Sequence, residues 1–162
     1  KIKNFIDFSI DLLIGGLVAL IIIFLSRFIF SRFKITKDML YEFKTLLNSP
    51  NAMTCWFLAL ISGVGEEFFF RGVLGPSFGI FLTSLIFGAI HYIPKDNPSF
   101  GPKFYWEYML FAFSVSIIFG LIVEARSNLY AVTIAHILIN GLNLNWISRL
   151  KIEKSFDGLT EN

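Results

Sequence analysis

The sequence contains little of what a soluble or disulfide-stabilised protein needs. Of its 162 residues, one is cysteine and two are histidine. A single cysteine excludes a disulfide framework and a thiolate metal site. Charged residues make up only 16% of the chain, whereas 55% of the residues are hydrophobic. This balance excludes an ordinary soluble domain and predicts a one-domain polytopic membrane protein.

Apolar runs of about 17–25 residues are long enough to cross a bilayer as helices. We identify such runs at 8–30, 52–75, 78–92, 105–123 and 130–147. The third is short, so we expect it to be tilted or partly re-entrant. The first is too long for a signal sequence and ends in Arg27 and Arg32 rather than at a small-residue cleavage site. The predicted fold class is therefore all-α, a polytopic integral membrane bundle of about five transmembrane helices. The chain does not begin with Met, which leaves open whether further spans precede it.

Basic residues collect at one set of span ends. If the loop 31–51 is cytoplasmic, ten of the fourteen basic residues lie on the cytoplasmic side. These are Arg27, Arg32, Lys34, Lys37, Lys44, Lys95, Lys103, Arg149, Lys151 and Lys154. Such asymmetry predicts a multi-pass protein of the cell membrane with this loop and the C-terminus in the cytoplasm. Because the basic residues lie at span edges, the net charge of +2 gives no indication of a nucleic-acid partner.

The segment 31–51 alternates charged residues with apolar ones, which is typical of an amphipathic surface helix lying along a leaflet. An ordinary interhelical linker is the alternative. The turn-rich stretch 94–103 contains Pro94, Pro98, Gly101 and Pro102 and separates two spans. The expected organisation is an N-terminal span with the amphipathic segment (1–51), a helical core (52–147) and a basic tail (148–162).

Three ionisable residues interrupt the second apolar run. Glu66 and Glu67 are adjacent, and Arg71 follows Glu67 by four residues. Residues four apart share a helical face, so Glu67 and Arg71 are expected to form an ion pair. Glu66 points about 100° away and needs another partner. Intramembrane charges mark functional sites by default. The alternative is a purely structural ion-pair cluster between helices.

Both histidines also lie in apolar runs. Phe87 precedes His91 by one helical turn and could form an apolar floor under its imidazole. His136 and Asn140 are four apart, so both can address one point from a single helical face. Alternatively, His91 is a polar residue at a span end, and His136 and Asn140 form hydrogen bonds that hold neighbouring helices together. Counted along their spans, all these groups reach similar depths, so they meet near mid-membrane if the helices are adjacent.

This set of side chains suits water activation for hydrolysis. Glu66 would be the general base, assisted by His91. His136 and Asn140 would stabilise the oxyanion that develops on the substrate. A second version places zinc on Glu66, His91 and His136 with one open coordination position. The sequence leaves both versions open.

The three motifs together resemble those of the CPBP family, which comprises CAAX-protease and bacteriocin-processing membrane proteins and is also called the Abi family. The family pattern is EExxxR, FxxxH and HxxxN on successive helices. Here it reads Glu66-Glu67-Phe68-Phe69-Phe70-Arg71, Phe87-Gly88-Ala89-Ile90-His91 and His136-Ile137-Leu138-Ile139-Asn140. The resemblance covers about residues 52–146.

The resemblance implies an intramembrane endopeptidase in which Glu66 and His91 activate water. It implies that His136 and Asn140 are oxyanion or metal partners and that Glu67 and Arg71 are supporting residues. Both a metalloprotease and a metal-free glutamate mechanism are associated with the family, so Zn²⁺ is a possible cofactor. The implied partners are the lipid bilayer and peptide or prenylated protein substrates.

Two other classes of function stay open. One is a non-catalytic membrane immunity or signalling scaffold with the same fold. The other is a haem protein with His91 and His136 as axial ligands, which leaves the two glutamates unexplained.

Overall fold

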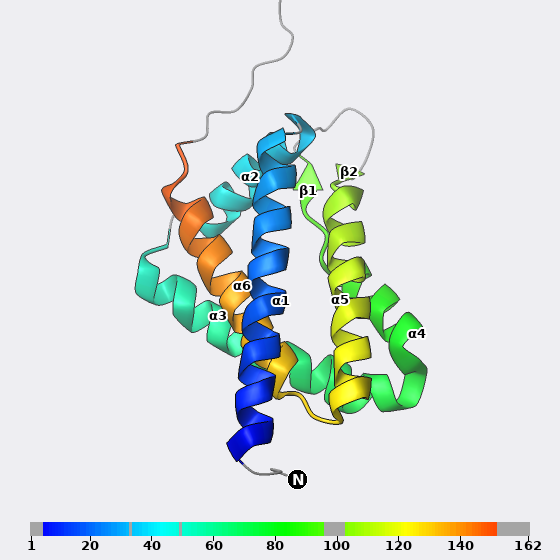
Figure 1. Cartoon of the computed structure of the whole chain (residues 1–162). Helices are drawn as coiled ribbons and strands as arrows, with labels where there is room; N and C mark the ends of the chain where they lie inside the picture. The colour runs from blue at the N-terminus through cyan, green and yellow to red at the C-terminus, as the bar shows by residue number, and fades with distance from the viewer. Residues whose placement is uncertain (1–4, 33, 49, 96–102, 152–162) are drawn as a thin grey trace, which may run out of the picture.

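The computed structural model describes residues 5–32, 34–48, 50–95 and 103–151, and nearly all of its elements are helices (Figure 1). In chain order they are α1 (Phe5–Arg32), α2 (Lys34–Leu47), α3 (Ala52–Glu67), the π-helix η1 (Phe68–Leu74), α4 (Gly75–Ile90), β1 (Pro94–Lys95), β2 (Lys103–Phe104), α5 (Trp106–Arg126) and α6 (Tyr130–Arg149). The two short strands pair antiparallel beside the turn-rich stretch, of which 96–102 lies outside the described residues. The predicted all-helical class is confirmed. Of the predicted basic tail, 152–162 also lies outside the described residues.

Three described segments are long and apolar enough to cross a membrane, namely Phe5–Phe30, Ala52–Ile90 and Trp106–Arg126. The second and third predicted spans are thus parts of one segment. That segment bends at Gly79, whose φ of 73° is left-handed. Figure 1 shows α4 turning back alongside α5 after this bend. The predicted fifth span is α6, a 20-residue helix that is not among the three apolar segments.

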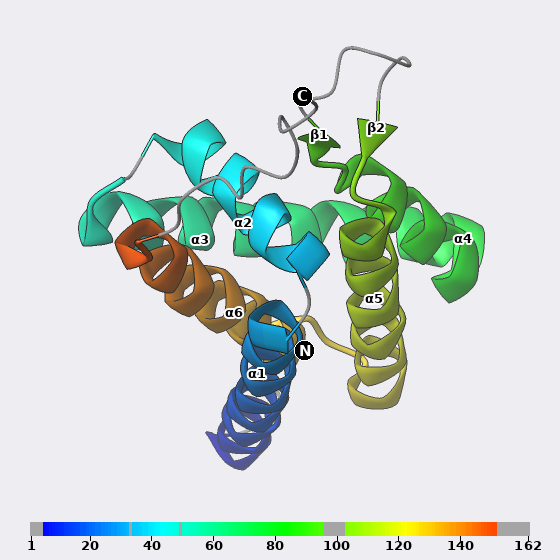
Figure 2. The same cartoon turned by 90° about the horizontal axis from the view of Figure 1, so that it is seen from above.

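The centre of the bundle is α6, which packs against both α1 and α3 (Figure 2). One apolar cluster joins α1 and α6 through Ala19, Ile22, Ile23, Val132, Ala135 and Ile139, with Phe119 of α5. Glycines allow the close approach of the backbones. A Cβ on Gly15 would lie 2.5 Å from the Ala131 carbonyl oxygen, and one on Gly63 would lie 2.6 Å from the Ile137 side chain.

The helix α2 lies across one end of the bundle, as Figure 2 shows. Its buried Met39 and Leu40 join an apolar cluster that includes Ile93, Tyr105 and Ile147. The Lys44 ammonium donates a hydrogen bond to the carbonyl oxygen of Leu150, beyond the end of α6. This packing supports the amphipathic helix predicted within 31–51 and brings that segment to the same end as the C-terminal part of α6.

At the opposite end, a polar cluster joins the beginning of α1 to the α5–α6 turn. Asp11 is buried and accepts hydrogen bonds from Arg126 at 2.6 Å and from Asn128 at 2.9 Å. Ser127 ends α5 with a left-handed φ of 54°. Asp11 was not predicted as a polar contact, although it is a charged residue within the first apolar run.

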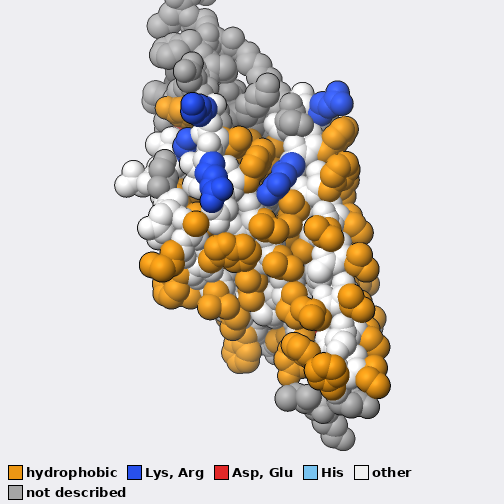
Figure 3. Space-filling view, turned by 60° about the vertical axis from the view of Figure 1, so that its left-hand side comes forward, with side chains coloured by type: hydrophobic (Ala, Val, Ile, Leu, Met, Phe, Trp, Pro, Cys, Tyr) orange, Lys and Arg blue, Asp and Glu red, His pale blue; other side chains and the backbone are white. Residues whose placement is uncertain are grey.

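The surface is more apolar than that of a soluble protein, and the interior contains several polar groups beside its apolar clusters. The face in Figure 3 is largely hydrophobic, with Lys and Arg side chains gathered toward one end. Among the residues that the structure describes, the buried polar or charged side chains are Asp11, Ser26, Glu67, Arg71, Thr83, Ser84, Ser116 and His136. Intramembrane ionisable groups characteristically face the bundle interior in this way.

Candidate active site

The buried face of α3 determines where its two glutamates point. Its buried residues are Cys55, Ala59, Gly63 and Glu67, each four residues from the next. Positions four apart form one stripe on a helix, and this stripe packs against α6. Glu67 therefore projects into the core with no exposed side-chain area, whereas the Glu66 side chain keeps 28% of its surface exposed.

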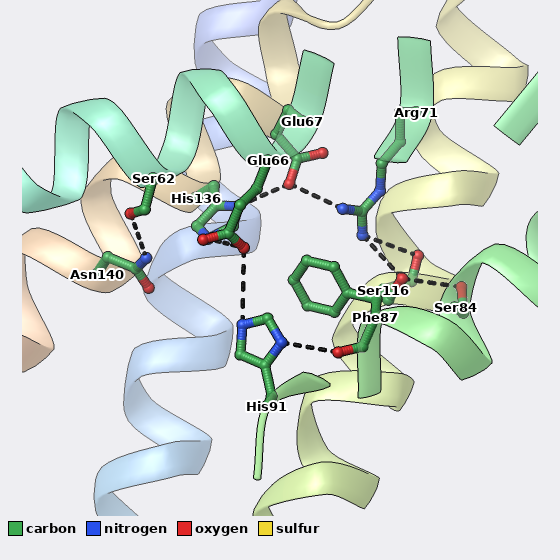
Figure 4. Close-up of polar contacts among 10 residues, drawn as sticks. All are labelled: Ser62, Glu66, Glu67, Arg71, Ser84, Phe87, His91, Ser116, His136 and Asn140. Carbon is green, nitrogen blue, oxygen red and sulfur yellow. Dashed lines mark hydrogen bonds and ion pairs between the residues drawn. The ribbon is translucent and has the colours of Figure 1, made fainter. Parts of the chain in front are cut away.

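Glu67 has two partners, one expected and one not. The predicted ion pair with Arg71 is present, with Nη1 3.1 Å from Glu67 Oε1. The same oxygen lies 2.6 Å from Nδ1 of His136 (Figure 4). The contact with His136 was not predicted, since residues on different helices cannot be paired by spacing. An ionised carboxylate only accepts hydrogen bonds, so we assign a proton to Nδ1 of His136, which donates it in a hydrogen bond to Glu67.

Glu66 faces both histidines. Its Oε2 atom lies 3.6 Å from Nε2 of His91 and 3.9 Å from Nε2 of His136. The matching depths predicted from the sequence are therefore accompanied by adjacency of the helices. Glu66 Oε2 is buried and has no hydrogen-bond partner among the described residues. Polar atoms farther apart than about 3.5 Å are beyond direct hydrogen-bond distance, and a shared water can connect them.

His91 is held by the residue one turn before it. Its Nδ1 lies 2.7 Å from the Phe87 carbonyl oxygen, so Nδ1 carries the proton and donates it there. The two rings stack with centroids 4.2 Å apart, and Phe87 is buried. The apolar floor predicted under this imidazole is confirmed. In the neutral imidazole, Nε2 then presents a lone pair toward Glu66.

Asn140 lies one turn beyond His136 on α6, and its amide donates to Ser62 Oγ at 3.0 Å. Ser62 precedes Glu66 by one turn of α3, so this bond holds the Asn140 side chain on the Glu66 side of the α3–α6 interface (Figure 4). The amide nitrogen carries a second proton for another acceptor. Ser62 was not predicted, because a lone serine in an apolar run carries no distinctive signal.

Arg71 has further partners that sequence reasoning missed. It lies in η1, a π-helix, and its guanidinium carbon is 4.7 Å from the Phe87 ring centroid. Its Nη2 donates to Ser116 Oγ at 2.9 Å, and Ser116 Oγ donates to Ser84 Oγ at 2.9 Å. A π-helix following a glutamate pair fits the frequent occurrence of such helices at functional sites.

The three proposed zinc ligands were tested against this geometry. In chemistry they fit, since a carboxylate and two imidazoles are a known catalytic set, and both Nε2 atoms face Glu66. Within the described ranges, no group of three or more His, Cys, Asp or Glu side chains is placed to hold a metal ion, and the zinc version stays a prediction. The mechanism below therefore uses the side chains themselves.

Comparison with known proteins identifies the family. The model of a family described as type II CAAX prenyl endopeptidase Rce1-like matches residues 48–142, which is more than half of the chain. The chain belongs to this Rce1-like family. The matched residues contain all three sequence motifs and run from just after α2 into α6. The helices α1 and α2 lie outside the match.

Among curated proteins, the chain is 33% identical over 88 residues to the uncharacterized protein YpbD of Bacillus subtilis strain 168. The aligned part is 53% of this chain and 41% of the relative, so the chain spans less than half of that protein's length. A search of solved structures found no match. Membership of the Rce1-like family thus rests on the family model.

Proposed function

We propose that the chain is an intramembrane endopeptidase that hydrolyses peptide bonds with a water molecule held between Glu66 and the two histidines. The main support for this proposal is the short distance from Glu66 Oε2 to both imidazoles. This oxygen lies 3.6 Å from Nε2 of His91 and 3.9 Å from Nε2 of His136. Both Nε2 atoms lie near the same carboxylate oxygen, which has no hydrogen-bond partner among the described residues. A water between these atoms would satisfy it.

In the proposed first step, Glu66 removes one proton from the water, and the water oxygen bonds to the carbonyl carbon of the peptide. His91 accepts a hydrogen bond from the second water proton at Nε2, which orients the attack. The bond from His91 Nδ1 to the Phe87 carbonyl fixes the required tautomer. Glu66 then gives its proton to the leaving amine as the C–N bond breaks, which restores the carboxylate.

His136 and Asn140 would stabilise the oxyanion. Asn140 can donate a hydrogen bond with its second amide proton while the first remains hydrogen-bonded to Ser62 Oγ. The Nδ1–H group of His136 donates a hydrogen bond to Glu67. His136 can therefore donate from Nε2 only as the imidazolium, for which the Glu67 carboxylate is the counter-charge. Donors preorganised toward developing charge commonly contribute about 10²–10³-fold in rate.

The proposed substrates are peptides or the C-terminal segments of prenylated proteins, reached from the bilayer. This proposal follows from the family description and from the placement of the site among apolar helices. We further propose that the protein lies in the cell membrane with α2 on the cytoplasmic side. Basic side chains at the α2 end support that orientation.

The test uses the full chain purified in detergent, with its metal content measured, and presents matched prenylated and unmodified peptides. Glu66→Gln keeps the size of the side chain and removes the base, so cleavage should fall by at least about 10²-fold. His136→Ala should also lose activity. The matched control is Glu124→Gln, which changes an exposed carboxylate at the end of α5 and should cleave as wild type does.

The same assay separates the competing functions. Wild type that cleaves no better than Glu66→Gln, with both proteins folded, would contradict the protease and favour the scaffold. Activity that disappears on metal removal and returns with added zinc would contradict the metal-free mechanism. An absorption spectrum with a Soret band would point to the haem alternative.

A further inference from the structure

A continuous line of buried polar groups runs from the candidate site across the bundle. It begins at His136 Nδ1, 2.6 Å from Glu67 Oε1, and continues to Arg71 Nη1 at 3.1 Å. Arg71 Nη2 then reaches Ser116 Oγ at 2.9 Å, and Ser116 reaches Ser84 Oγ at 2.9 Å (Figure 4). The five residues come from α6, α3, η1, α5 and α4.

Every member of this line is buried, with relative exposures of 6% or less. A buried polar network is costly when one member loses its partner, since no water can take its place. The guanidinium of Arg71 is the central member because it has two separate donor atoms. One holds Glu67, and the other holds the serine pair.

The direction of the hydrogen bonds assigns a role to each serine. Arginine only donates, so Ser116 Oγ must accept from Arg71, and its own proton then goes to Ser84. Ser84 thereby sets the rotation of the Ser116 hydroxyl, and the Ser116 hydroxyl sets the plane of the guanidinium. The Ser116 backbone oxygen offers a second contact to Nη2, but at 3.4 Å.

We propose that Ser116 is a positioning residue that acts through Arg71 and Glu67 on the imidazole of His136, with Ser84 fixing the Ser116 hydroxyl. Without the Ser116 hydroxyl, Nη2 retains only the longer backbone contact, and the guanidinium turns toward it. That turn moves Nη1 relative to Glu67 and so changes the hydrogen bond at His136 Nδ1. The catalytic consequence rests on the proposed endopeptidase function, whereas the structural consequence does not.

The sharpest test observes the imidazole itself, because the chain contains only two histidines. The full chain in detergent micelles, labelled with ¹⁵N-histidine, gives two sets of ring signals, which a His91→Phe variant tells apart. Ser116→Ala should shift the Nδ1 signal of His136 and that of its hydrogen-bonded proton, while the His91 signals stay in place. The matched control is Ser114→Ala on the same helix, whose exposed hydroxyl bonds only to the Leu110 carbonyl and which should move neither set.

Ser84→Ala is the second variant and decides the outcome if Ser116→Ala does not fold. It should shift the same His136 signals by a smaller amount. His136 signals that match wild type in the folded variants would overturn the proposal, as would equal shifts for Ser114→Ala.

Peptide cleavage provides the second readout. Ser116→Ala should lower kcat by about tenfold with little change in KM, since a small displacement of a catalytic group mainly affects the reaction step. If no peptide is cleaved by any form, the proposed function fails, but the His136 signals still decide whether Ser116 positions that ring.

Discussion

At the scale of single residues, two adjacent glutamates have opposite environments. Glu67 is fully buried and shared between Arg71 and His136, whereas Glu66 is partly exposed and faces the Nε2 atoms of both histidines. The difference comes from a rotation of about 100° between neighbours on a helix. One residue type therefore supplies both a structural counter-charge and the candidate base.

This contrast predicts opposite effects on stability. Glu67→Gln removes the charge that balances a buried guanidinium, so it should lower the free energy of unfolding by about 3–5 kcal/mol. Glu66→Gln removes a carboxylate whose Oε2 has no hydrogen-bond partner among the described residues, so stability should stay within about 0.5 kcal/mol of wild type. Thermal unfolding in one detergent compares the two. Equal losses would contradict the assigned roles.

The residue-level prediction from sequence succeeded where contacts lie within one helix. The Glu67–Arg71 pair and the stacking of Phe87 on His91 both follow from a spacing of four. It failed for Glu67 with His136 and for Arg71 with Ser116, which join different helices. The stripe of Cys55, Ala59 and Gly63 leading to Glu67 was an available signal that this carboxylate faces a neighbouring helix.

At the scale of elements, the close contact of α3 with α6 determines how the site is assembled. These helices supply Glu66, Glu67, His136 and Asn140. Their approach depends on Gly63, where a Cβ would lie 2.6 Å from the Ile137 side chain and 3.1 Å from its backbone nitrogen. A small residue one turn before Glu67 is thus a requirement of the site.

Gly63→Ala should therefore destabilise the protein by about 1–3 kcal/mol through overpacking. Gly65→Ala is a matched control on the same helix, because nothing lies within 4 Å of its added Cβ. Alanine favours a helix over glycine by up to about 1 kcal/mol, so the control should be as stable as wild type or more so. Chemical unfolding of both variants measures this. A more stable Gly63→Ala would show that α3 and α6 can separate without cost.

The lengths of the apolar runs predicted where helices form, but they did not predict which helices are continuous with one another. The helices α1 and α5 follow predicted runs, whereas 52–75 and 78–92 belong to one bent segment. The glycines and proline between Gly75 and Gly79 are compatible both with a tight turn between two helices and with a bend inside one segment. The sequence alone does not distinguish these two structures. The π-helix was not predicted, because it differs from an α-helix only in its hydrogen-bond register.

At the scale of the whole molecule, most of the described basic side chains lie at the α2 end, and the polar Asp11 cluster lies at the opposite end. The α2 end contains Arg27, Arg32, Lys44, Arg149 and Lys151, while Arg126 is paired with Asp11 at the other end. This polarity supports the proposed orientation, in which the α2 end faces the cytoplasm.

Labelling of introduced cysteines should reveal that orientation. The single native cysteine, Cys55, is fully buried, so it provides an unreactive background. Glu124→Cys should react with a membrane-impermeant maleimide in intact cells, and Thr45→Cys should react only after permeabilisation. Both positions are exposed. The reverse pattern would place the α2 end outside the cell.

The position of α6 also has a consequence for biosynthesis. Glu66 lies on one continuous segment and His91 directly follows that segment, so the two can meet as soon as the segment folds back at Gly79. His136 and Asn140 arrive last, when α6 packs against α1 and α3. A partly synthesised chain therefore has the proposed water-activating pair without the groups that would stabilise the reaction. The proposed peptide hydrolysis therefore begins only after α6, the last described helix, has packed into place.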